Sequence, residues 1–279
     1  MKIIFFGTPE YVVPILSKLA KVHEIVAVVT QPPMPVGREQ FKKYSPVDDW
    51  AHKRDVPIFF DFEKPFPEAE LGVCAAYGKI IPKSVIDLFK FGILNIHPSL
   101  LPKYRGASPI NEAIKNGDPE CGVTIIKMDE KMDHGPIVTF FKDEILADDT
   151  TESLRERLFE RSADVLIQLI PAYVSGKVKP KEQNHSEATF TKILTREDGL
   201  ISLKEKKPEE IERFLRAMSP WPGVWTYVKL NPKEGQKRLK ILETHVEEGK
   251  MVLDKVQLEG KNEVSWKQFK EGYPKVDFL

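Results

Sequence analysis

The 279-residue sequence is poor in cysteine and has no excess of either charge. It contains two cysteines, Cys74 and Cys121, each within an apolar or glycine-flanked segment. Two cysteines are too few for a disulfide framework or a cysteine-built metal site, so we predict two buried, reduced thiols. Lys plus Arg and Asp plus Glu both number 42. Because a polyanionic partner usually demands a basic excess, any contact with nucleic acid must be local.

The sequence also has no long apolar segment. No run reaches the ~18 apolar residues that a membrane-spanning helix needs. The chain passes from Met1 directly into a strand-like segment, KIIFF, without the pattern of a secretory signal peptide. We therefore expect a cytoplasmic protein that does not enter a membrane.

Two common kinds of ligand site have no signal in the sequence. Neither G-x-G-x-x-G nor G-x-x-x-x-G-K occurs, so the glycine after the first strand is expected to form a plain tight turn. His23, His52, His185 and His245 lie apart without the spacing of metal ligands. We expect no bound metal.

Strand-like and helix-like patterns alternate in the first half of the chain. Two strand–helix–strand units are present, one over residues 2–30 and one over residues 71–96. Near-continuous apolar strands with helices between them are typical of a parallel sheet that is covered on both faces. We therefore predict an α/β protein with a Rossmann-like, mostly parallel sheet.

The length of the chain exceeds what one hydrophobic core usually supports, so we predict two domains. Thr151 begins a helix with one apolar stripe, which we expect to end before Pro171. A polar, irregular stretch follows, and then a helix-like segment, EEIERFLRAM, and short alternating strands separated by turn residues. We predict a first domain over residues 1–183, a linker over 184–203, and a small β-barrel or sheet over 204–279.

The segment from Gln31 to Pro46 interrupts the alternation with several prolines and a glycine. It also carries three cations, Arg38, Lys42 and Lys43. We predict that the whole segment is a loop. Long loops inside a compact domain are uncommon unless they bind something, so we expect this loop to have a binding role.

Two polar segments follow apolar strands and could carry chemistry. Asn95 and His97 are two residues apart, so on an extended backbone their side chains point to the same face, near the carboxyl end of a strand where α/β sheets bind ligands. Asp133 lies in an acidic loop after the strand VTII and could orient a histidine. An isolated Asn-x-His pair could equally satisfy buried backbone groups.

The sequences of these two segments are NIHPSLLPKYRGASPI and GVTIIKMDEKMDHGPI. Together they resemble the formyltransferase family that uses 10-formyltetrahydrofolate. The resemblance implies that the catalytic residues of the family are Asn95, His97 and Asp133. It implies that the residues contacting the folate are Ser99, Leu100, Leu101 and Pro102. It also implies a formyl-donor substrate and a second domain that is an OB-like β-barrel. This domain is shorter in the present sequence than is usual in the family.

Within this family, the opening segment IIFFGTPEYVVPIL and the segment TQPPMPVGREQFKKYSPV are similar to the members that act on methionyl-tRNA. The similarity implies that initiator methionyl-tRNA is the acceptor and that Arg38, Lys42 and Lys43 approach its acceptor end. We expect the chain to act as a monomer.

Three alternatives stay open. The same catalytic residues would serve an enzyme that formylates an amino sugar linked to a nucleotide. The glycinamide ribonucleotide reaction is a third enzymatic possibility, although the proteins that perform it lack a second domain. A catalytically silent RNA-binding relative is a possibility from another class, but the retention of all three polar groups argues against it.

Overall fold

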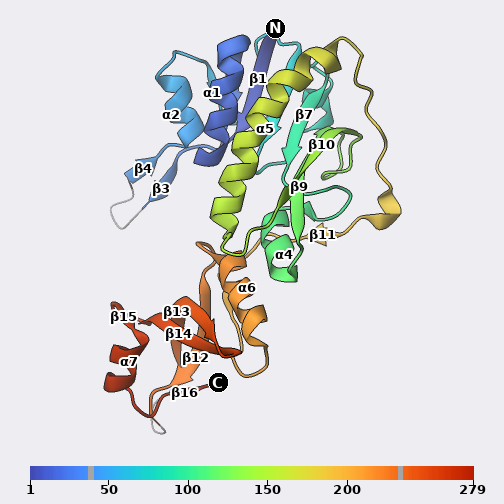
Figure 1. The fold of residues 1–279 in the computed structure, drawn as a ribbon. Helices are drawn as coiled ribbons and strands as arrows, with labels where there is room; N and C mark the ends of the chain where they lie inside the picture. Colours follow the sequence, from blue (N-terminus) through green and yellow to red (C-terminus); the bar gives the residue numbers. More distant parts are fainter. Residues whose placement is uncertain (37–40, 232–234) are drawn as a thin grey trace. The chain divides into compact units, whose positions relative to one another are not determined.

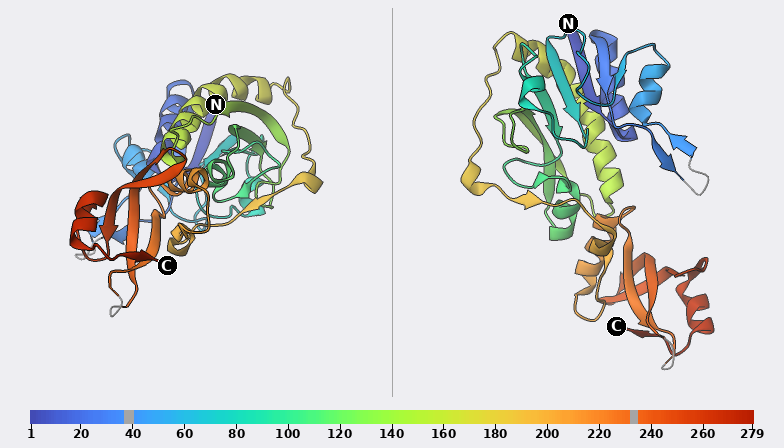
Figure 2. Two further views of the ribbon diagram at one scale, coloured as in Figure 1. Left: turned by 60° about the horizontal axis from the view of Figure 1, so that its bottom comes forward. Right: turned by 180° about the vertical axis from the view of Figure 1, so that it is seen from behind.

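The computed structural model describes residues 1–36, 41–231 and 235–279 (Figures 1 and 2). Contacts between residues divide the chain into two compact units. The first contains residues 1–106, 121–144 and 155–191, and the second contains residues 107–120, 145–154 and 192–279. The domain boundaries at residues 183 and 204 stay a prediction.

The first unit is built on a seven-stranded sheet in the order β10-β9-β7-β6-β1-β2-β5. The strands are β1 (Lys2–Gly7), β2 (Glu24–Val29), β5 (Ile58–Phe59), β6 (Leu71–Ala75), β7 (Ile93–His97), β9 (Glu120–Lys127) and β10 (Ile137–Glu144). The neighbours from β7 to β5 pair in parallel, whereas β7 pairs with β9 in the antiparallel sense. The predicted α/β fold with a Rossmann-like, mostly parallel sheet is confirmed.

Both faces of this sheet are covered. One face carries a cluster of buried side chains that includes Phe6, Cys74 and Ile93 together with residues around α3 (Lys83–Ile86). On the other side, helix α5 (Thr151–Val174) runs beside α1 (Val13–Val22) (Figure 1). A Lys18–Asp164 ion pair with an Nζ to Oδ1 distance of 2.6 Å joins these two helices. Coverage on both faces explains why the strands read as continuous apolar runs.

The prediction that α5 ends before Pro171 is wrong, because the helix continues through this proline to Val174. Proline removes one helical hydrogen bond and clashes with the preceding turn, which normally ends a helix. Here the last turn is held by tertiary contacts that the sequence does not reveal. Tyr173 is buried, and its hydroxyl donates to the carbonyl of Phe91 at 2.8 Å.

The prediction that residues 31–46 form a loop throughout is also wrong. Two short strands, β3 (Met34–Val36) and β4 (Phe41–Lys43), pair in the antiparallel sense. The base of this hairpin is closed by a hydrogen bond of 2.7 Å between the buried hydroxyls of Thr30 and Ser45. Ser45 also caps α2 (Pro46–His52) by accepting from the amide of Asp48.

The second unit contains a five-stranded sheet in the order β15-β14-β13-β12-β16, with antiparallel pairings. Its strands are β12 (Val224–Lys229), β13 (Lys237–Glu247), β14 (Lys250–Leu258), β15 (Glu263–Ser265) and β16 (Asp277–Phe278). Its helices are α4 (Pro109–Asn116), α6 (Pro208–Met218) and α7 (Trp266–Gly272). Ile211 of α6 packs with Val228, Leu239 and Val256 in the core of this unit. The predicted small β domain is therefore confirmed.

Both cysteines are free and buried, as predicted. Burial raises the pKa of the Cys74 thiol to about 12, which keeps it protonated at neutral pH. Among the described residues, no helix combines the length and the apolar character needed to span a membrane.

Candidate active site

Asn95 and His97 are the third and the last residue of β7. The sequence suggested that they follow the strand, but the structure includes both in it. Asn95 pairs with Cys74 of β6 in the parallel register, and the alternation along β7 puts Ile93, Asn95 and His97 on one face. His97 is 4% exposed, so its imidazole meets its partners in a largely dry environment.

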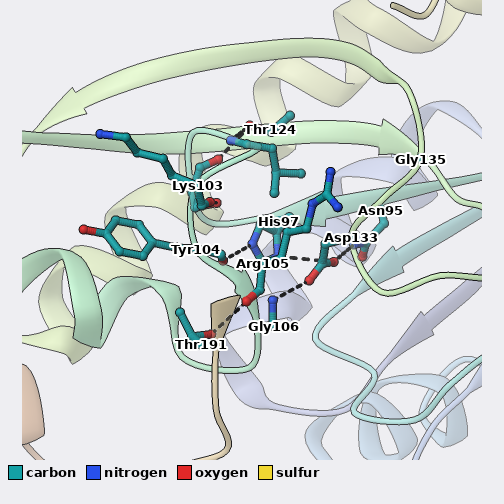
Figure 3. A network of polar contacts seen from close by, with 12 residues as sticks. Asn95, His97, Lys103, Tyr104, Arg105, Gly106, Thr124, Asp133, Gly135 and Thr191 are labelled. Carbon is teal, nitrogen blue, oxygen red and sulfur yellow. Dashed lines mark hydrogen bonds and ion pairs between the residues drawn. The ribbon is translucent and has the colours of Figure 1, made fainter. Parts of the chain in front are cut away.

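Asp133 joins these two side chains (Figure 3). Its Oδ1 atom lies 3.3 Å from the amide nitrogen of Asn95, which donates to it, and 3.4 Å from Nδ1 of His97. Its Oδ2 atom accepts a hydrogen bond of 2.8 Å from the backbone amide of Gly106. Asn95 and His97, neighbours on one strand, thus form one cluster with the carboxylate of Asp133, which is far from both in the sequence.

The second ring nitrogen of His97 faces a backbone oxygen. Nε2 lies 2.9 Å from the carbonyl of Tyr104, and a carbonyl can only accept, so Nε2 carries a hydrogen in this contact. Because Nδ1 faces the Asp133 carboxylate, both nitrogens of the ring are directed at oxygen acceptors. The ring is therefore held on two sides. His97 can gain or lose a proton only at a ring nitrogen whose contact with its oxygen partner is first broken.

The backbone is strained on both sides of the carboxylate. Tyr104 has a φ of 59° and Asp133 a φ of 48°, a left-handed conformation that costs non-glycine residues about 1–2 kcal/mol. The amide of Tyr104 donates to the hydroxyl of Thr189 at 2.8 Å and helps to hold this conformation. Such strain persists only where the surroundings enforce it, and it clusters at functional sites.

Thr124 fixes the segment that is predicted to contact folate, residues 99–102. This threonine lies opposite His97 in the antiparallel β7–β9 pair. Its buried hydroxyl donates to the carbonyl of Ser99 at 2.6 Å and accepts from the amide of Leu101 at 3.0 Å. Leu101 is buried, Leu100 and Pro102 are half-buried, and the Ser99 hydroxyl donates to the carbonyl of Lys103. The four residues therefore form a fixed, partly apolar border beside His97.

Replacing Thr124 with valine is expected to lower the free energy of unfolding by about 2–4 kcal/mol, because an isosteric methyl leaves a buried amide and a buried carbonyl unpaired. Urea unfolding measures this loss. Thr226 provides the matched control: it is equally buried, and its hydroxyl has no hydrogen-bond partner in the described part of the chain. Thr226→Val should be neutral or stabilising, and an equal loss in both variants would contradict the role given to the Thr124 hydroxyl.

The cations predicted to contact tRNA are only partly described. Arg38 lies outside the described residues. Lys42 and Lys43 are exposed on β4. No hydrogen bond or ion pair links either lysine to the cluster around Asp133, as far as the described residues show.

Sequence patterns missed several residues of the site, because their contacts are made across long sequence separations. The missed groups are the Thr124 hydroxyl, the backbone of Tyr104 and Gly106, and the side chain of Gln183. His134 and His185 are also far apart in the sequence, but their rings stack with centroids 3.9 Å apart and an interplanar angle of 5°. Within the described parts of the chain, no three His, Cys, Asp or Glu side chains are arranged to hold a metal ion.

Comparisons with known proteins agree on one family. Residues 1–170 match the formyl transferase family, and residues 193–251 match the C-terminal domain of formyl transferases. The chain is 42% identical to the methionyl-tRNA formyltransferase of Roseiflexus sp. (strain RS-1) over 81% of this chain and 73% of that protein. It is 34% identical to the methionyl-tRNA formyltransferase of Geotalea daltonii over 98% and 96% of the two chains.

A solved structure extends the likeness of the fold. The N-formyltransferase from Helicobacter canadensis, in complex with folinic acid and dTDP-3-aminofucose, matches with a TM-score of 0.65 and 18% identity over 95% of this chain and 98% of that one. At this identity the likeness concerns the fold alone. The family matches, by contrast, cover both the segment with Asn95, His97 and Asp133 and the C-terminal segment. The chain belongs to the formyl transferase family.

Proposed function

We propose that this enzyme transfers the formyl group of 10-formyltetrahydrofolate to the α-amine of initiator methionyl-tRNA, the step that prepares this tRNA for translation initiation. The observation that carries the proposal is the convergence of Asn95, His97 and Asp133 at the carboxyl end of β7. Formyl transfer to an amine develops a negative charge on the formyl oxygen and a positive charge on the attacking nitrogen. The cluster offers a polar partner for each of these two charges.

Asn95 is the donor to the developing oxyanion. Its amide nitrogen carries two hydrogens, and one of them is directed at Asp133. The other is free to donate to the formyl oxygen as the carbonyl carbon becomes tetrahedral. A fixed donor of this kind contributes about 2.7–4 kcal/mol to the stability of comparable acyl-transfer transition states.

His97 carries the proton from the attacking nitrogen to the folate nitrogen N10. The amine nitrogen attacks the formyl carbon and forms the new C–N bond, and the bond between this carbon and N10 of the folate then breaks. The attacking nitrogen loses one proton and N10 gains one, so the overall reaction needs no external acid or base. Asp133, whose Oδ1 atom lies 3.4 Å from Nδ1, holds the ring in place for this transfer.

The residues beside the cluster suit a folate donor, which is a substrate and not a resident cofactor. The border formed by residues 99–102 offers apolar side chains for a flat ring system, and its backbone is already fixed by Thr124. A fixed border requires little ordering when the substrate binds, which favours affinity. Ser99, Leu100, Leu101 and Pro102 are proposed to contact the donor on this ground.

The choice of acceptor rests on relatives rather than on the cluster itself. Asn95, His97 and Asp133 would serve an amino sugar equally well. Two relatives that are 34% and 42% identical are methionyl-tRNA formyltransferases, and the β3–β4 hairpin presents Lys42 and Lys43 to solvent. Exposed cations on a hairpin suit the phosphates of a tRNA end. These two points favour methionyl-tRNA.

One assay tests the acceptor directly. The purified chain is mixed with 10-formyltetrahydrofolate and offered either charged initiator tRNA or an amino-sugar nucleotide, and the formylated products are measured in parallel. Formylation of the tRNA alone is expected. Preferential formylation of the sugar would replace the proposed acceptor, and transfer to neither would refute the proposal.

Replacing both Lys42 and Lys43 with alanine is expected to raise the KM for the tRNA while leaving hydrolysis of the formyl-folate nearly unchanged. Each lost phosphate contact removes roughly one unit from the salt dependence of tRNA binding. Steady-state kinetics at two salt concentrations measure both effects. Lys21 and Lys53, which are exposed lysines outside the hairpin, provide a matched double-alanine control. An unchanged KM and salt dependence would remove the hairpin from the tRNA site.

We further propose that the chain acts as a monomer in the cytoplasm. Its two unpaired cysteines and its charged tRNA substrate support the location. Sedimentation equilibrium tests the monomeric state, and a dimer at micromolar concentration would contradict it.

A further inference from the structure

Gln183 lies beside the loop that carries Asp133, although fifty residues separate the two positions in the sequence. Its segment is anchored by a pair of hydrogen bonds, of 2.7 and 2.8 Å, between the backbones of Lys181 and Ile137. The Gln183 side chain is 5% exposed. Its Nε2 atom donates to the carbonyl of Asp133 at 2.9 Å and to the carbonyl of Gly135 at 2.7 Å. Both hydrogens of the amide are thus used on the backbone of one loop.

The other end of the same amide contacts Arg105. The Oε1 atom of Gln183 accepts a hydrogen bond of 2.6 Å from the guanidinium of Arg105, which is 3% exposed. Arginine can only donate, so the orientation of the amide is fixed: oxygen toward Arg105 and nitrogen toward the loop. Arg105 directly precedes Gly106, whose amide donates to the Asp133 carboxylate. Gln183 therefore links the two backbone segments that hold this carboxylate (Figure 3 shows Arg105, Gly106 and Asp133).

Arg105 is also held in place by His185. The same terminal nitrogen, Nη2, lies 2.8 Å from Nδ1 of His185, which must accept and hence carries no hydrogen. Desolvation, with the neighbouring His134 and Arg105, lowers the pKa of His185 and favours this neutral form. His185 stacks on His134, whose Nδ1 atom lies 2.6 Å from Asp129 at the start of the same loop. The guanidinium is therefore a fixed support for Gln183.

We infer that Gln183 is a positioning residue for formyl transfer, acting through the Asp133 loop and not on the substrate. The inference rests on the proposed function for its kinetic consequence only. Asp133 has a left-handed backbone with a φ of 48°, and Gln183 holds this part of the loop by donating to the carbonyl of Asp133 and to that of Gly135, two residues later. Without these two hydrogen bonds the loop relaxes, and the carboxylate loses its place between Asn95 and His97.

Two substitutions separate hydrogen bonding from packing. Gln183→Met keeps the length of the side chain and removes every hydrogen bond. Gln183→Glu keeps the acceptor for Arg105 but directs a carboxylate oxygen at two carbonyls. Gln257 is the matched control, because its amide also donates to a backbone carbonyl, that of Lys261 at 3.0 Å, but on an exposed surface. Gln257→Met should behave as the wild type.

Both Gln183 variants are expected to lower kcat by a factor of about 10–100, because a displacement of the carboxylate by about 1 Å can cost up to about 100-fold in rate. The KM for 10-formyltetrahydrofolate should stay within about three-fold of wild type. The glutamate variant has a further signature. A protonated carboxyl can donate to one of the two carbonyls, so its kcat relative to wild type should rise as the pH is lowered from about 8 to about 6. A side chain with only a packing role would show no such recovery.

Hydrogen exchange of residues 128–136, measured by mass spectrometry on the full chain, gives a readout that does not need activity. Exchange in this loop should be faster in both Gln183 variants and unchanged in Gln257→Met. If the wild type transfers formyl groups and the Gln183 variants match it in kcat and in exchange, the positioning role is wrong. If the wild type transfers none, the proposed function fails, and the exchange rates alone decide whether Gln183 holds the loop.

Discussion

Replacing His97 with alanine should lower the turnover of formyl transfer by a factor of roughly 100–10,000, the usual contribution of a positioned proton-transfer group. The KM for 10-formyltetrahydrofolate should change by less than about three-fold, because the contacts of the imidazole strengthen only in the transition state. The measurement is steady-state kinetics with each substrate varied in turn. Asp133 would lose one of its partners in this variant, but it would keep those from Asn95 and Gly106.

A second histidine in the chain supplies the control. His245 also faces a carboxylate, with its Nδ1 atom 2.8 Å from Asp254, but both side chains are exposed on the sheet of the second unit. His245→Ala should leave turnover unchanged. If His97→Ala reduced donor affinity and turnover by the same factor, the histidine would be a binding group and not a participant in proton transfer.

The Asp133→Asn variant extends this test. If Asp133 acts through His97, the double variant His97→Ala/Asp133→Asn should be only slightly slower than His97→Ala alone, since the effects of residues that act as a unit are not additive. If the rate losses of the two single variants instead multiplied in the double variant, the carboxylate would act independently of the ring.

Replacing Gly135 with alanine should lower the free energy of unfolding by about 3 kcal/mol and abolish most of the activity. A Cβ atom at this position would overlap the backbone oxygen of Lys127, at the end of β9, and would also approach the amide of Asp129. Neither is the end of a flexible side chain, so the clash can be relieved only by moving the loop. Such a movement would carry Asp133, two residues earlier, away from Asn95 and His97.

Urea unfolding and the formyl-transfer rate measure the two effects of Gly135→Ala. Gly272→Ala is the control, because a Cβ atom at Gly272 would have no neighbour within 4 Å. It should be neutral or slightly stabilising, because alanine loses less conformational freedom than glycine on folding. A fully stable and active Gly135→Ala variant would show that the loop does not need its present path.

The sequence predicts the parts of this protein that depend on local pattern. The mostly parallel sheet follows from apolar runs such as that of β1, whose periodicity is set by burial on both faces. The candidate catalytic residues Asn95, His97 and Asp133 were proposed from strand ends and from a family resemblance, and the structure brings the three together. These predictions depend on residues that are close together in the sequence, and the catalytic roles of the three residues stay a prediction.

The predictions that failed depend on contacts between distant segments. Pro171 should end a helix, but burial of Tyr173 and its hydrogen bond to Phe91 outweigh the local cost. Prolines suggested a loop before Pro46, but backbone pairing and the Thr30–Ser45 hydrogen bond close a hairpin. Gln183 was missed for the same reason, since nothing near it in the sequence indicates that it meets a loop fifty residues away.

The antiparallel direction of β9 determines how the carboxylate reaches its partners. Lys127, the last residue of β9, pairs with Leu94 near the start of β7, so the chain leaves β9 at the opposite end from His97. Residues 128–136 must then turn back along β7 before β10 begins, and each residue covers at most ~3.6 Å. Glu130, Lys131 and Met132 are exposed, so their identity can vary during evolution. Their number sets how far the loop extends from β9, because the loop returns to its starting point, where the amide of Lys127 donates to the carbonyl of Pro136 at 3.0 Å.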